Sequence, residues 1–170
     1  MSHWLFILEG LERSALSVSL RASAWVYPLV NTLHILGIAL LIGPILILDW
    51  RLLRQRTTLA AQDSASTRIP VSTLAAVLLP AARSGFALAV LTGLLLFMAR
   101  PLDYAFHGLF QLKLGFVALA LLNILWLHRC GAWGLALAQE RADGRVRLAC
   151  AVSLVCWLLA LSLGRLVGYR

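Results

Sequence analysis

Residues 22–48 of the 170-residue chain read ASAWVYPLVNTLHILGIALLIGPILIL, and this stretch decides the fold. It contains no Asp, Glu, Lys or Arg. A helix needs about 20 apolar residues to cross the hydrocarbon core of a bilayer, so the stretch is long enough. Trp25 and Tyr27 lie near its start and Trp50 lies just after it, where membrane proteins favour aromatic side chains. The stretch therefore predicts a transmembrane helix over about residues 24–48.

Three further apolar stretches follow, over about residues 80–99, 109–127 and 148–167. The second is expected to begin near Pro80, because proline is accepted in the first turn of a helix. Residues 4–20 carry leucines near helical spacing with acidic residues between them, which predicts an amphipathic helix along the membrane surface. The expected fold class is all-α: an integral membrane four-helix bundle in a single domain, residues 1–170, with an N-terminal amphipathic helix.

Composition supports the membrane class. The chain is 61% hydrophobic and 13% charged, whereas soluble domains carry about 25% charged residues. The net charge of +8 does not indicate nucleic-acid binding, because the arginines cluster between apolar stretches and accompany no nucleic-acid-binding motif. The three cysteines form no CxxC pair, which argues against a disulfide framework. We therefore expect the lipid bilayer, and no nucleic acid, as a partner.

The basic residues indicate an orientation. The loop between the first and second spans and the loop between the third and fourth spans lie on the same side of the membrane. Nine of the fifteen basic residues are on that side: Arg51, Arg54, Arg56, Arg68, Arg83, Arg129, Arg141, Arg145 and Arg147. The other six lie on the opposite side. Loops rich in Lys and Arg stay in the cytoplasm, so this count predicts a multi-pass protein of the bacterial inner (cytoplasmic) membrane with both termini in the periplasm.

His34 is the first candidate site residue. It lies nine residues beyond Trp25, roughly 13 Å into the first span at 1.5 Å per residue. An imidazole at that depth cannot reach water and needs a partner inside the bundle. Tyr27, Asn31 and Gly37 share its face by helical spacing. Two interpretations stay open: a neutral histidine bonded to another helix, or a metal ligand, above all an axial ligand of haem iron.

Further basic residues fall in the same half of the membrane as His34. The first and third spans run in the same direction, so Lys113 lies at a comparable depth, and Arg165 ends the fourth span on that side. Arg100 lies in the adjoining loop. A shared planar, anionic ligand explains this gathering, because haem propionates bind Arg and Lys side chains. The candidate cofactor is therefore haem b. His128 sits at the opposite interface.

Several motifs resemble those of HemJ-type protoporphyrinogen IX oxidases: His34-Ile35-Leu36 with Gly43-Pro44 and Arg51, Gln111-Leu112-Lys113-Leu114, and the run from Trp126 to Gly131. The resemblance implies a bundle of four or five spans that binds haem b, with His34 and Lys113 as the haem-site residues. CopD-type copper-resistance membrane domains share the histidine-then-glycine pattern of the first span. The chain also resembles a bacterial family of four-span proteins with His34-Ile-Leu-Gly37 and Asp49-Trp-Arg51-Leu-Leu.

Three classes of function are compatible with these features. The first is a membrane haem protein that transfers electrons or oxidises a porphyrin, an oxidoreductase with a quinone or another redox partner. The second is copper handling, although Cu(I) favours thioether and thiolate ligands and the chain has only Met1 and Met98. The third is a non-catalytic scaffold or accessory subunit. A homo-oligomer is compatible with each.

The orientation is testable with a reporter enzyme that is active only in the periplasm. A fusion after Arg170 is expected to be active, and a fusion in the loop near Asp63 inactive, because the arginine count places that loop in the cytoplasm. The reverse pattern of activity would overturn the orientation.

Overall fold

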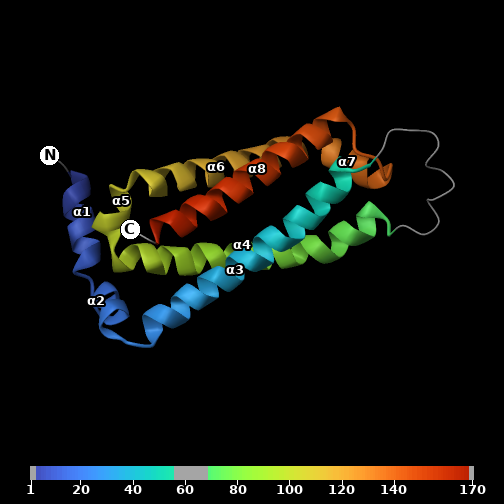
Figure 1. The fold of residues 1–170 in the computed structure, drawn as a ribbon. Coiled ribbons are helices and arrows are strands. Elements are labelled where there is room, and N and C mark those ends of the chain that lie inside the picture. Colours follow the sequence, from blue (N-terminus) through green and yellow to red (C-terminus); the bar gives the residue numbers. More distant parts are fainter. Residues whose placement is uncertain (1–2, 56–68, 169–170) are drawn as a thin grey trace.

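The computed structural model describes residues 3–55 and 69–168, and in them the chain is helical without a strand. Four helices are long and apolar enough to cross a membrane: α3 (Val26–Leu53), α4 (Val71–Ala99), α6 (Gly108–Arg129) and α8 (Gly144–Val167). Consecutive long helices run in opposite directions along the bundle (Figure 1). The prediction of an all-α, multi-pass membrane bundle is confirmed. The loop expected over residues 57–68 lies outside the described residues.

Short helices mark the two ends of the bundle (Figure 1). Helices α1 (His3–Glu12), α2 (Ala15–Ala22) and α5 (Pro101–Ala105) lie at one end, called here the α5 end. Helix α7 (Ala132–Ala138) lies at the other, the α7 end. The short connections between the long helices explain why consecutive spans run in opposite directions.

The long helices form two pairs. Helix α3 packs along α4, α6 packs along α8, and a contact between α3 and α8 joins the pairs. Four spans joined by short loops predict a bundle in which the fourth span packs near the first, and the α3–α8 contact confirms this prediction. In the described part of the chain, α4 and α6 do not approach each other. The site described below lies where the two pairs face each other.

Two glycines let α3 and α4 approach closely. A Cβ atom on Gly85 would lie 2.5 Å from the backbone nitrogen of Leu41, and one on Gly37 would lie 2.7 Å from that of Ala89. Real Cβ atoms do not come so near to backbone, so both positions require glycine at this helix separation. Small residues at helix contacts are the usual device of membrane bundles, where close van der Waals packing replaces the hydrophobic effect.

Glycines inside spans are expected at helix contacts, which predicts Gly37, Gly43, Gly93 and Gly115 there. Two of the four, Gly37 and Gly93, do lie at the α3–α4 contact. The prediction is wrong for Gly43 and Gly115, where an added Cβ would meet nothing within 4 Å. Gly85, the tightest of the contact glycines, was not expected. Hydropathy shows which glycines lie within spans, but it does not show which of them face the neighbouring helix.

The second span begins earlier than expected. Helix α4 starts at Val71, and Pro80 lies inside it. A proline inside a helix removes one backbone hydrogen bond, and membrane helices tolerate this. A start at Pro80 would place Arg83 in the first turn of the helix, within reach of Asp49 at the membrane interface. Arg83 lies instead well inside α4, on an exposed surface. It forms no ion pair with Asp49; the ion pair in the described residues is Arg21–Glu12.

The expected amphipathic helix is divided in two at Arg13–Ser14. The hydroxyl of Ser14 accepts a hydrogen bond from the backbone nitrogen of Ser17 and so caps α2. Ser17 is buried, and its own hydroxyl donates to the carbonyl of Met98 at 2.8 Å, which attaches α2 to the end of α4. Large apolar side chains remain exposed on both short helices: Phe6, Ile7, Leu16 and Val18.

The α7 end is held by a loop-to-helix contact. Glu140 has a positive φ of 51° and accepts hydrogen bonds from the backbone nitrogens of Val71 and Ser72 and from the Ser72 hydroxyl. These hydrogen bonds to the charged form lower the pKa of Glu140. Gln55 completes the contact by bonding to the Glu140 carbonyl and to the backbone nitrogen of Ala142.

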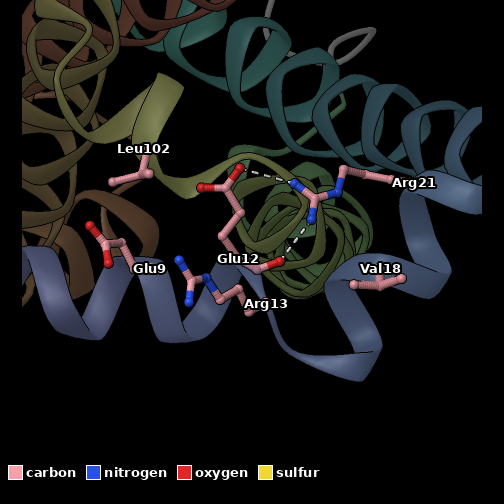
Figure 2. A pocket seen from close by; sticks show the side chains of 6 residues that line it. All are labelled: Glu9, Glu12, Arg13, Val18, Arg21 and Leu102. Atoms are coloured by element: carbon pink, nitrogen blue, oxygen red, sulfur yellow. Dashed lines mark hydrogen bonds and ion pairs between the residues drawn. The ribbon is translucent and has the colours of Figure 1, made fainter.

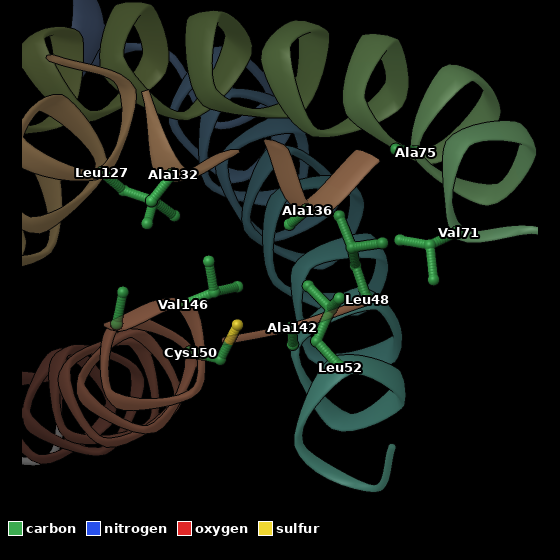
Figure 3. Close-up of a cluster of buried hydrophobic side chains, with 11 residues drawn as sticks. Leu48, Leu52, Val71, Ala75, Leu127, Ala132, Ala136, Ala142, Val146 and Cys150 are labelled. Carbon is green, nitrogen blue, oxygen red and sulfur yellow. The ribbon is translucent and has the colours of Figure 1, made fainter. Parts of the chain in front are cut away.

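A buried apolar cluster lies directly beside this contact. Figure 3 shows side chains of α3, α4, α7 and α8 converging in it, among them Leu52, Val71, Ala136 and Val146. Leu52 and Val146 have no exposed surface. The cluster closes the α7 end, so the polar side chains of the bundle interior lie away from it or at its edge.

The glycine contact between α3 and α4 generates a stability prediction. Gly85→Ala is expected to lower the free energy of unfolding by about 1–3 kcal/mol, because the new methyl group meets backbone that cannot move aside. Gly115→Ala is the matched control; it gains the helix propensity of alanine, up to about 1 kcal/mol, without a clash. Thermal unfolding in detergent measures both. Equal midpoints for the two variants would refute the packing.

Glu140 generates a pH prediction. Its pKa is lowered in the folded chain, so the stability it contributes is present above the ordinary carboxyl pKa and disappears as the pH falls through the lowered value. The unfolding midpoint of Glu140→Gln should therefore fall less than that of the wild type between about pH 5 and pH 3. Glu9→Gln, at an exposed position of α1, serves as control. Identical pH profiles for wild type and Glu140→Gln would contradict the prediction.

Candidate functional site

His34 lies on α3 one turn before Gly37, so the close α3–α4 contact brings its ring against α4. Its Nδ1 lies 3.1 Å from the hydroxyl oxygen of Thr92. That hydroxyl in turn donates to the carbonyl of Leu88 at 2.6 Å. Thr92 is buried and His34 is half-buried. The depth of His34 in the span predicts a partner inside the bundle, and Thr92 is that partner.

The hydrogen-bond chain favours one tautomer of His34. If the single proton of the Thr92 hydroxyl is used toward Leu88, the hydroxyl oxygen is left to accept a hydrogen bond. Nδ1 of His34 is then the donor in the 3.1 Å contact, and Nε2 of the neutral ring carries the lone pair. A histidine that ligates a metal usually donates its other ring N–H to such a partner.

Gly93 leaves one side of the imidazole without a side chain. A Cβ atom there would lie 3.0 Å from Cε1 of His34 and 4.0 Å from Nε2. The glycine therefore gives the ring its place beside α4. The interpretation in which His34 only joins two helices accounts for the Thr92 contact and for the hydrogen bond of the ring with the backbone of Ala89, also on α4.

Lys113 comes to the site from the other helix pair. It lies on α6, half-buried, with its Nζ packed at Gly164 of α8, where an added Cβ would lie 3.1 Å away. His34 and Lys113 are close enough to interact electrostatically. Within residues 3–55 and 69–168, Lys113 makes no ion pair. The two residues that the sequence placed at a common depth therefore interact across a distance, because α3 and α6 do not pack against each other in the described part of the chain.

The remaining predicted residues lie around this pair toward the α5 end. Tyr27 hydrogen-bonds with Tyr104, and Arg100 lies within electrostatic reach of Tyr104. Burial, followed by the contact with Tyr27, raises the pKa of Tyr104. Arg165 is exposed and directly follows Gly164. Asn31 is also exposed, one residue away from the packed stripe of Val30, His34 and Gly37, so it is not at the centre of the face expected to hold it.

Thr92 and Gly164 were missed by the sequence analysis. Each matters only through the residue that it meets on another helix, and the register between two helices is not visible in one sequence. The signal available for Thr92 was a hydroxyl inside an apolar span, immediately before a glycine.

Two surface hollows lie away from the site. One is at the α5 end, formed by Glu9, Glu12, Arg13, Val18, Arg21 and Leu102 (Figure 2). Arg21 bonds there to the carboxylate of Glu12 at 3.0 Å and to its backbone carbonyl at 2.7 Å. The second is at the α7 end, around Asp143 and Arg147. Neither includes His34 or Lys113.

Comparison of the chain with models of protein families, with curated protein sequences and with solved structures finds no match. The chemistry of the site is therefore inferred from its own residues. In the described part of the chain, no three His, Cys, Asp or Glu side chains gather where they could hold a metal ion.

Proposed function

We propose that this chain is a membrane-embedded haem b protein that serves electron transfer or porphyrin-linked oxidation. The observation that carries the proposal is the position of His34 inside the bundle. Its Nδ1 lies 3.1 Å from the Thr92 hydroxyl, its ring also hydrogen-bonds with the backbone of Ala89, and Lys113 of the opposite helix pair lies within electrostatic reach.

The residues present fit an axially ligated haem. Nε2 of His34 would bind the iron, and Thr92 would hold the ring in the orientation that presents it. The His34 ring lies against Gly93 and the Lys113 ammonium group lies against Gly164, where a larger side chain would collide with them, and α4 and α6 do not pack against each other in the described residues. A haem bound here would supply a one-electron change at its iron.

Lys113 has two roles open to it. As a neutral amine it would be the second axial ligand, opposite His34. As a charged ammonium group it would hold a propionate, a task that Arg100 and Arg165 at the α5 end could share. The same end carries Trp25, which is 85% exposed and suits a membrane interface.

The proposal places the protein in the bacterial inner membrane with both termini in the periplasm, as the arginine count predicts. Electrons would then pass to or from a quinone in the bilayer or another redox partner at the periplasmic side. The exposed apolar surface of α6 faces lipid or a second copy of the chain.

Absorption spectra of purified variants test the site. His34→Ala is expected to lose nearly all bound haem, because the axial ligand is removed. Thr92→Val should weaken haem binding about 10-fold, because the support of the ligating ring is lost. His128→Ala is the matched control, since His128 is exposed and its Nδ1 contacts the carbonyl of Ile124 in its own helix.

Lys113→Met separates the two roles of the lysine. The substitution should shift the haem absorption bands if Lys113 ligates iron, and should only weaken binding if it holds a propionate. Full haem content with an unchanged spectrum in His34→Ala would refute the proposal.

A further inference from the structure

Asp49 is a buried carboxyl group inside a membrane-spanning helix. The sequence places it at the end of the first span, where an acid would meet water. In the structure α3 continues to Leu53, and Asp49 is only 8% exposed. An ionisable side chain buried in a span is costly and is seldom kept without a function.

The carboxyl group faces α8 and is satisfied on one side only. Ser153 and Cys150 of α8 hydrogen-bond to it. Its Oδ2 atom is fully buried and has no hydrogen-bond partner among residues 3–55 and 69–168. Figure 3 shows Cys150 with Leu48 and Leu52, the neighbours of Asp49 along α3, in the apolar cluster at the α7 end.

The described cations of the surrounding helices make no ion pair with Asp49. At the end of α3, Arg51 donates to the carbonyl of Ile69 and Arg54 lies over the ring of Trp50. On α8, Arg147 donates to the carbonyl of Leu53, and Arg145 and Arg165 are exposed. Arg83, the charged residue of α4, is exposed, and α7 contains no charged residue. Among the described residues, Cys150 is therefore the titratable group that contacts Asp49.

The protonation state follows from this environment. An ionised carboxylate buried without a cation costs several kcal/mol, even after relaxation of its surroundings. A neutral carboxylic acid avoids most of that cost, and its added proton turns the unpartnered oxygen into a donor. A position so close to the α7 end is within reach of water during local opening of the helix ends.

We propose that Asp49, together with Ser153 and Cys150, is an intramembrane proton-binding site that exchanges its proton with the α7 end. The site is independent of the haem proposal, because it lies on the α3–α8 contact and uses none of the same residues. Its ligand is a proton, and its working group is the Asp49 carboxyl.

Labelling with dicyclohexylcarbodiimide tests the proposal on the purified full chain in detergent. The neutral acid transfers its proton to a carbodiimide nitrogen, its oxygen adds to the central carbon, and the acyl group then migrates to nitrogen to give a stable N-acylurea. The carboxylate does not react. Peptide mass spectrometry at neutral pH should find one carbodiimide added at Asp49, with labelling that decreases as the pH rises.

Asp49→Asn should abolish this label, and Asp103→Asn, at an exposed position of α5, should leave it unchanged. The infrared spectrum gives a second readout: a neutral-acid carbonyl band that shifts in D2O and is missing in Asp49→Asn. If Asp49→Asn does not fold, two wild-type readouts still test the proposal: the residue to which the label is mapped and the neutral-acid carbonyl band. An unlabelled Asp49 at neutral pH, or a wild type without the band, would overturn the proposal, whether or not the protein binds haem.

Discussion

The contact of α3 with α4 at Gly37 and Gly85 is the constraint on which the rest of the structure depends. Backbone meets backbone there, so the two helices can pack in only one register. That register places His34, one turn from Gly37, against Thr92 and Gly93. A bulkier residue at either glycine would separate the helices and remove Thr92 from reach of the imidazole.

Polar side chains inside the bundle are divided between two places. His34 and Lys113 lie toward the α5 end, and Asp49 lies toward the α7 end. Between them the interior is apolar, with Leu41, Ala120 and Trp157 in one buried cluster. The two polar sites therefore lie toward opposite ends of the bundle, with apolar packing between them.

The sequence predicts the parts of this structure that a single helix determines. The length and hydropathy of the four spans, the depth of His34 and the common depth of Lys113 all follow from counting residues along one helix. Features that depend on two helices could not be predicted in the same way. Gly85, Thr92 and Gly164 acquire their roles from the neighbour that each one faces, and the register between helices is set by packing.

Two local errors have a physical cause as well. Pro80 reads as a helix start, but a bundle in lipid accepts the lost hydrogen bond and lets α4 begin at Val71. Asp49 reads as an interfacial acid, but α3 extends past it and α8 covers it. In both positions the environment supplied by other helices outweighs the residue's own preference.

The absorption spectrum of the purified wild-type protein, expressed with ample haem supply, tests the central claim most directly. The orientation of His34 predicts a Soret band with α and β bands in the reduced state, at about one haem per chain. A folded, helical protein that shows none of these bands under the same conditions would contradict the claim.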